Sequence, residues 1–164
     1  MKKITYFVFS CIILIFLSDC SGYKPIFGSG NLKFKISNYS IEGNKILGNK
    51  IYSRLNSLSK SNKNNKNVRS IDLFIKTTKD KTPTSKNSAG KILEYKITLN
   101  TEVKVKDFIT DDYILNQIFI SSVTYKTQKY YGDTIKLEDQ SLDNLVNKTY
   151  QELINRLTQN ITAN

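Results

Sequence analysis

Cys20 lies at the end of an apolar amino-terminal segment and offers the clearest chemistry in this sequence. Two lysines open the chain, an apolar run extends over residues 4–17, and the residues that follow include Leu17-Ser18-Asp19-Cys20. A basic start, an apolar core of this length and a processing site together describe a secretory signal peptide. The apolar run is too short to span a bilayer, which takes roughly 20 apolar residues.

The four residues ending in Cys20 match a bacterial lipobox, in which the cysteine thiol receives a diacylglyceryl group and the signal is cleaved before it. Asp19 departs from the pattern, since Gly, Ala or Ser usually precedes the cysteine. Several acyl chains form a stable anchor, because each buried CH₂ contributes about 0.8 kcal/mol. We therefore expect a lipid-anchored protein with residues 1–19 as signal peptide. The alternatives are an ordinary cleaved signal with a chance cysteine and an uncleaved anchor.

Residues for other chemistry are scarce. The chain contains no histidine and two cysteines, of which Cys11 would leave with the signal peptide. Zinc and other transition-metal sites need clusters of His or Cys, and Ser-His-Asp or Cys-His catalysis needs a histidine. We therefore expect no enzyme, no metal, no cofactor and no disulfide within the mature chain.

The chain is strongly basic, with 25 Lys+Arg against 14 Asp+Glu and a net charge of +11. Such a charge attracts polyanions, for example nucleic acid, anionic lipid or phosphorylated glycolipid. An exported lipoprotein has little access to nucleic acid, so we expect lipid-type polyanions and no nucleic acid as partners. A coding bias towards Lys, Asn and Ile explains the charge equally well, so the charge alone names no ligand.

Beyond the signal, the hydrophobic pattern predicts one α+β domain. Alternating apolar residues predict strands over residues 32–41, 68–78, 92–106 and 115–127. Apolar stripes with helical spacing predict helices over residues 44–59 and 139–162. This order favours a two-layer sandwich, in which a four-stranded, mostly antiparallel sheet carries both helices on one face. Residues 20–31 would be a lipidated tether and residues 32–164 a single domain.

Three further expectations concern side chains within this domain. The strand over residues 92–106 has a polar face of Lys96, Thr98, Asn100, Glu102 and Lys104. Residues 79–91 read as a turn-rich basic loop that carries Lys79, Lys81, Lys86 and Lys91. We expect Leu153 and Leu157 of the last helix to pack on Leu99 and Ile97.

After Cys20 the sequence continues Ser21-Gly-Tyr-Lys-Pro-Ile-Phe-Gly28. With the lipobox and the element order, this stretch resembles the LptE family, the lipopolysaccharide-assembly lipoproteins of Gram-negative outer membranes. Many members begin their mature chain with a Cys-Gly-Phe-x-Pro-Leu-Tyr-Gly-like sequence, relative to which Ser21 is an insertion. The resemblance covers the whole mature chain, although the body matches in pattern and not in signature residues.

The resemblance implies a non-catalytic protein, lipid-anchored on the periplasmic side of the outer membrane. It would plug the β-barrel LptD, help that barrel to assemble, and bind lipopolysaccharide on its way to the outer leaflet. The polar strand face would suit a polar barrel lumen. The best cations for lipid A phosphates would be Lys79, Lys81, Lys86 and Lys91, unless these lysines only solvate a loop.

Two other functions remain open from the sequence. An auxiliary lipoprotein of a phospholipid ABC transport system would share the anchor and a similar sandwich. A pilotin-like lipoprotein that binds a secretion pore would share the anchor as well. Co-purification can distinguish the three functions, because each requires a different membrane partner.

Overall fold

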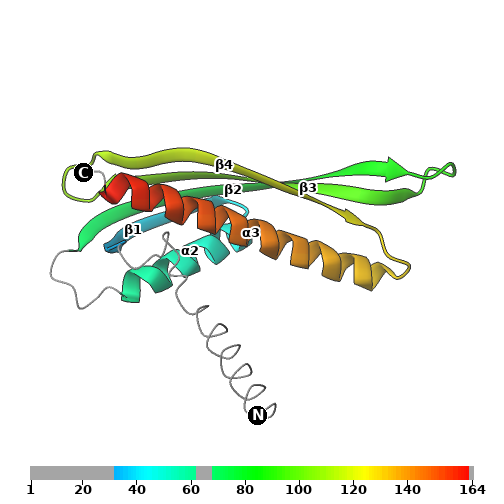
Figure 1. Cartoon of the computed structure of the whole chain (residues 1–164), viewed down its shortest axis with the longest axis horizontal. Coiled ribbons are helices and arrows are strands. Elements are labelled where there is room, and N and C mark those ends of the chain that lie inside the picture. The colour runs from blue at the N-terminus through cyan, green and yellow to red at the C-terminus, as the bar shows by residue number, and fades with distance from the viewer. Residues whose placement is uncertain (1–31, 62–67, 163–164) are drawn as a thin grey trace, which may run out of the picture.

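The structure is a computed structural model that describes residues 32–61 and 68–162, so Cys20 and the tether lie outside it. Its elements are β1 (Phe34–Gly43), α2 (Lys45–Ser61), β2 (Arg69–Lys86), β3 (Ile92–Asp107), β4 (Tyr113–Lys126) and α3 (Tyr131–Thr162). The sheet has the order β1-β2-β3-β4, with β1 parallel to β2 and the other pairs antiparallel. Both helices lie on one face of this sheet (Figure 1), which confirms the predicted α+β sandwich.

Strand β3 follows its predicted alternation from Ile97 to Asp107, whereas Leu93 near its start is exposed. On the helix side Ile97, Leu99, Val103 and Val105 are fully buried, whereas the polar residues between them stay partly exposed to solvent. Thr101 is also fully buried, and its Oγ1 has no hydrogen-bond partner among the described residues. The buried residues of β3 join one core with both helices, and each buried Leu or Ile contributes about 1.5–3 kcal/mol.

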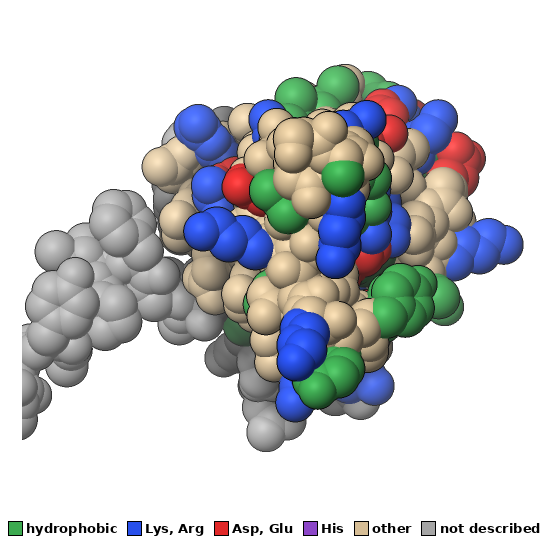
Figure 2. All heavy atoms as spheres, turned by 90° about the vertical axis from the view of Figure 1, so that its right-hand side faces the viewer, with side chains coloured by type: hydrophobic (Ala, Val, Ile, Leu, Met, Phe, Trp, Pro, Cys, Tyr) green, Lys and Arg blue, Asp and Glu red, His purple; other side chains and the backbone are tan. Residues whose placement is uncertain are grey.

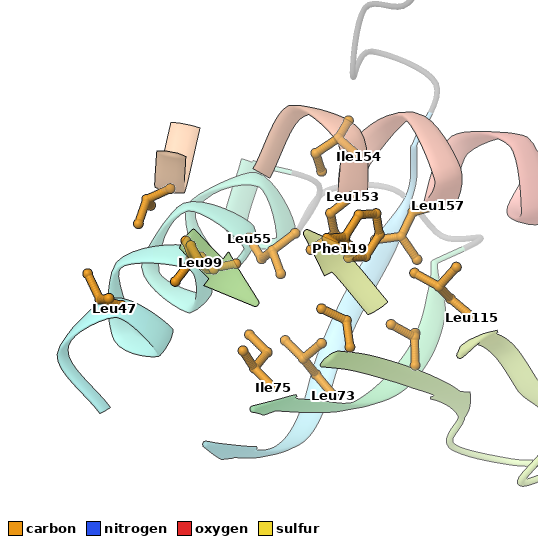
Figure 3. Packing of buried hydrophobic residues seen from close by; sticks show 14 of the residues in the cluster. Leu47, Leu55, Leu73, Ile75, Leu99, Leu115, Phe119, Leu153, Ile154 and Leu157 are labelled. Carbon is orange, nitrogen blue, oxygen red and sulfur yellow. The ribbon is translucent and has the colours of Figure 1, made fainter. Parts of the chain in front are cut away.

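Helix α3 lies antiparallel to β4, and two polar contacts fix its position along the strand. Thr149 Oγ1 and Ser121 Oγ lie 3.2 Å apart, and the Asn160 side chain donates to the Ile114 carbonyl at 2.8 Å. Between these contacts, Leu153 and Leu157 gather with Phe119 and Leu115 (Figure 3).

The expected packing of Leu153 on Leu99 is therefore shifted along the helix. Leu99 pairs with Ser121 across the sheet, which places it level with Thr149. Thr149 precedes Leu153 by about one helical turn. The periodicity of α3 had identified the buried face of the helix, but it contains no information on where that face meets the strand.

Strand β2 extends to Lys86, so the predicted loop over residues 79–91 is wrong for most of its length. Beyond Thr77, β2 has lost β1 as a neighbour and pairs only with β3. An edge position tolerates Pro83, which has no N–H to donate, and the pairing register shifts on its carboxyl side. Pairing with the long strand β3 thus makes a segment of loop-like composition extended. Together the two strands form a hairpin that projects beyond β1 (Figure 1).

Helix α3 begins at Tyr131, eight residues before the predicted start at residue 139. Thr134 closes the junction with β4, because its Oγ1 accepts a hydrogen bond from the Gln128 amide at 2.8 Å. The extra turns carry α3 beneath the projecting hairpin, and Glu138 lies about two turns into the helix. The fully buried apolar residues of α3 start at Leu142, and Leu137 before it is only partly buried, which is why the apolar pattern missed the first turns.

Candidate functional site

Of the four lysines predicted to meet phosphates, Lys79 and Lys81 lie within strand β2 and point towards α3. Lys79 and Lys81 continue the inward-facing row that begins with Ile75 and Thr77. Lys79 Nζ lies 3.2 Å from Glu138 Oε1, and Lys81 Nζ forms an ion pair with Glu138 Oε2. Their charges are therefore partly balanced within the protein.

Glu138 is the centre of a polar cluster between the hairpin and α3. Its carboxylate is only 11% exposed and also accepts a hydrogen bond from the Tyr125 hydroxyl at 2.8 Å. The Lys81 ammonium lies 4.3 Å from the centre of the Tyr95 ring, and this ring stacks on Tyr125. The cluster therefore ties β2, β3 and β4 to the first turns of α3.

Two opposing effects set the ionisation of this cluster. Burial favours the neutral form of Glu138, but hydrogen bonds from Lys81, Tyr125 and Lys79 outweigh it and hold the pKa of Glu138 below its usual value. Burial also opposes the charge on Lys81, but the hydrogen bond to Glu138 outweighs it and raises the pKa of Lys81. Burial raises the pKa of the Tyr125 hydroxyl, which stays protonated and donates. We call this arrangement, in which Lys79, Lys81 and Tyr125 all bind the Glu138 carboxylate, the Glu138 clamp.

The other two predicted lysines flank the turn of the β2–β3 hairpin. Lys86 ends β2 and Lys91 precedes β3, and both are exposed. Asn87 organises the turn, because its side-chain oxygen accepts hydrogen bonds from the Ala89 and Lys91 amides at 3.1 and 2.9 Å. Among the described residues, no ion pair involves Lys86 or Lys91. These two cations are available to a ligand.

Two more lysines and two tyrosines share this end of the molecule. Thr127 donates its amide to the Leu93 carbonyl at 2.9 Å, so the β4–α3 junction lies beside the start of β3. We define the hairpin end as the exposed residues Lys86, Lys91, Lys126, Lys129, Tyr130 and Tyr131. Lys and Arg side chains are spread over this end, with hydrophobic side chains between them (Figure 2).

Sequence reasoning missed the second half of the hairpin end. Lys126 belongs to the predicted strand over residues 115–127, and a polar link that carries tyrosines follows it over residues 128–133, about 40 residues after Lys86. The pairing of Glu94 with Lys126 brings this link beside the hairpin. Glu94 is partly buried and offsets part of the charge of Lys126, so Lys86, Lys91 and Lys129 carry most of the positive charge.

The outer face of the sheet carries the polar residues expected on β3. Some of its polar groups contact one another within the sheet: Lys104 lies 2.8 Å from Glu102, and Asn100 contacts Asp80 at 3.4 Å. On the neighbouring β4, Ile118 and Ile120 are 61% and 67% exposed. The face is therefore a mixed polar surface with one apolar strip.

Within residues 32–61 and 68–162, no group of three or more His, Cys, Asp or Glu side chains is placed to hold a metal ion. In the same part of the chain, no helix is long and apolar enough to cross a membrane.

No protein-family model matches the chain, and no curated protein matches its sequence. Among solved structures, the fold is similar to a minor lipoprotein from Acinetobacter baumannii, with a TM-score of 0.56 and 11% identity over 79% of this chain and 94% of that one. It is also similar to an uncharacterized lipoprotein B from Nitrosomonas europaea, with a TM-score of 0.54 and 12% identity over 76% and 82% of the two chains. At these identities the likeness concerns the fold.

Proposed function

We propose that this protein is an outer-membrane lipoprotein, anchored through Cys20, that plugs and helps to assemble an LptD-like β-barrel and binds lipopolysaccharide. The observation that carries the proposal is the hairpin end, where exposed lysines without ion-pair partners lie beside exposed tyrosines. The lipobox and the resemblance of residues 22–28 to the LptE family support the anchor and the partner. Two solved structures with a similar fold are described as lipoproteins, which is consistent with a lipid anchor at Cys20.

The two ends of the ligand match the two kinds of side chain at the hairpin end. Lipid A carries phosphates, and ammonium groups form charge-assisted hydrogen bonds with phosphate oxygens. Tyrosine offers an apolar ring beside a polar hydroxyl, which suits the boundary between sugar and acyl chain. The turn at Asn87 is held by four hydrogen bonds, so Lys86 and Lys91 are presented on a defined backbone. A defined backbone lowers the ordering cost of binding.

The plug role would fall to the outer face of the sheet. A barrel lumen is polar, so a plug must offer side chains that tolerate water and polar contacts. The outer face of β3 has this character, and on it Lys104 pairs with Glu102 while Asn100 contacts Asp80 of β2. This division places glycolipid binding and barrel contact on different surfaces, which separate variants can test.

Replacing Lys86 and Lys91 by Ser should weaken binding to immobilised lipopolysaccharide about tenfold at low salt, equivalent to about 1.4 kcal/mol. Well-formed charge-assisted contacts contribute about 1.5–3 kcal/mol each, and exposure to salt reduces that value. The matched control changes Lys45 and Lys148, two exposed lysines on the helices, to Ser, with no expected effect. Equal binding by both double variants across a salt series would show that the hairpin lysines only solvate a turn. Lys79 and Lys81 stay unchanged, because removing them would leave Glu138 unpaired.

Cys20→Ser should abolish incorporation of labelled fatty acid, because the lipobox cysteine is the acceptor. Label retained in this variant, or absent from the wild type, would contradict the anchor. Affinity purification of the wild type from solubilised membranes tests the partner. A heat-resistant β-barrel is the expected companion, whereas an inner-membrane ATPase complex or a secretion pore would replace the proposal with one of the other two functions.

A further inference from the structure

The turn between β3 and β4 has a markedly apolar tip. Phe108 and Ile109 are 52% and 85% exposed, and Tyr113, the first residue of β4, is 56% exposed. Turns in water usually carry polar residues, whereas this one presents its two largest apolar side chains to solvent. An exposed apolar tip of this kind indicates a contact with another apolar phase.

The backbone amides of this tip have hydrogen-bond acceptors within the protein. Asp107 Oδ1 accepts hydrogen bonds from the Ile109 and Thr110 amides at 2.8 and 3.2 Å. The Asp111 amide donates to the Asp107 carbonyl at 3.0 Å, and Arg69 holds the Asp107 carboxylate at 2.6 Å. Backbone groups that lack partners are costly in lipid, so this pattern lets Phe108 and Ile109 leave water at low cost.

The tip lies at the end of the molecule where the described chain begins. Phe34 at the start of β1 pairs with Arg69 of β2, and the Phe108 amide donates to the carbonyl of the next residue, Ser70, at 3.0 Å. Two strand spacings of about 4.8 Å therefore separate the start of β1 from the tip. The β2–β3 turn lies at the opposite end (Figure 1).

The length of the preceding chain brings the anchor within reach of this end. Eleven residues lie between Cys20 and Leu32, and the twelve Cα–Cα steps span at most about 43 Å. Strand β1 runs away from the tip, so the chain enters the domain on the tip's side. A lipid anchor at Cys20 therefore lets the apolar turn reach the membrane surface.

The charges around the tip favour a zwitterionic surface over a strongly anionic one. Arg69 pairs with Asp107, and Lys106 pairs with Asp111 at 2.9 Å, so these charges cancel locally. Asp112 adds a further negative charge beside the tip. Within the turn itself, electrostatic attraction to anionic lipid is thus small, and contact there depends on the apolar side chains.

We propose that the β3–β4 turn is a second membrane contact, in which Phe108 and Ile109 enter the interface of the leaflet that holds the lipid anchor. This inference rests on the proposed anchor at Cys20 and does not involve the barrel. With two contacts at one end, the domain is oriented on the membrane, and the hairpin end with Lys86 and Lys91 points away from that leaflet. A single flexible anchor would leave the orientation free.

The test uses the lipidated protein in phosphatidylcholine–phosphatidylethanolamine vesicles, with an environment-sensitive fluorophore on I109C. The matched control carries the same fluorophore on N87C, in the turn at the opposite end. Mass spectrometry of each preparation first establishes that Cys20 carries lipid, which leaves the introduced thiol as the reactive one. Quenchers attached to the acyl chains should reduce emission at position 109 several-fold more than at position 87. Adding F108S to I109C should remove most of that difference, while the thermal melt stays unchanged.

Three results would overturn the proposal. Equal quenching at both positions in lipidated protein would remove the membrane contact and leave the anchor intact. Protection of position 109 that appears only after a purified β-barrel is added would assign the tip to a protein partner. Absence of lipid on the wild-type protein would overturn the anchor and this contact together.

Discussion

Changing Leu153 and Leu157 together to Ala should leave little folded protein at 25 °C. Both side chains are essentially fully buried, in the contact between α3 and β4. Each truncation removes buried methyl groups and leaves a cavity, at a cost of about 2–5 kcal/mol. A domain has an unfolding free energy of only about 5–15 kcal/mol in total, so the two substitutions together remove most or all of this stability.

Thermal and urea unfolding followed by circular dichroism measure this effect. The matched control changes Ile118 and Ile120 to Ala on the outer face of β4, where both side chains are more than half exposed. This pair removes a similar number of apolar atoms and should lower the melting temperature by a few degrees at most. Equal losses in the two double variants would mean that the core does not lie between α3 and the sheet.

Glu138→Gln should lower the unfolding free energy by about 1–3 kcal/mol at pH 7. The change keeps the shape of the side chain but removes the charge that holds Lys79, Lys81 and the Tyr125 hydroxyl. Both lysines remain about one-third exposed, so water compensates part of the loss. Asp143→Asn, which removes an exposed pair with Lys50, should cost well under 1 kcal/mol and is the matched control.

The effect of Glu138→Gln should depend on pH with a defined sign. The lowered pKa of Glu138 means that the folded protein favours the carboxylate more than the unfolded chain does. The stability from this group is therefore fully present above the unfolded value of about 4.5 and is lost as the pH falls through the folded pKa. The difference in urea stability between wild type and variant should shrink below pH 4.5. A difference that stays constant down to pH 2.5 would show that the ionised carboxylate contributes nothing.

The Glu138 clamp also changes how the basic residues must be tested. Lys79 and Lys81 had been grouped with Lys86 and Lys91 because all four lie within one short, basic, Pro-containing stretch. In the structure, the first pair stabilises the packing of α3 under the hairpin, and the second pair meets solvent. Removing all four would therefore mix a loss of stability with any loss of binding.

Local pattern was enough to predict most of the elements. The alternation in β3 and the apolar stripes of α2 and α3 each show which face of one segment is apolar. The order of residues within that segment is enough to identify the face. Two amphipathic helices and four strands with one apolar face have few compact arrangements, so the sandwich followed as well. The lipobox is likewise a local signal, readable without any fold.

Only the tertiary structure determined those features that depend on contacts between distant segments. Residues 79–86 have the composition of a loop, and they are a strand because β3 beside them supplies backbone partners, without interruption as far as Pro83. Glu138 forms ion pairs with two lysines almost 60 residues away in the sequence. Only the position of α3 on the sheet brings these side chains together. The hairpin end joins Lys86 to Lys129, and the β3–β4 turn adjoins the start of β1, through strand pairing. The sequence by itself determined which faces are buried, and packing determined which distant side chains meet, because hydrophobic patterning is a property of one segment whereas register is a property of two.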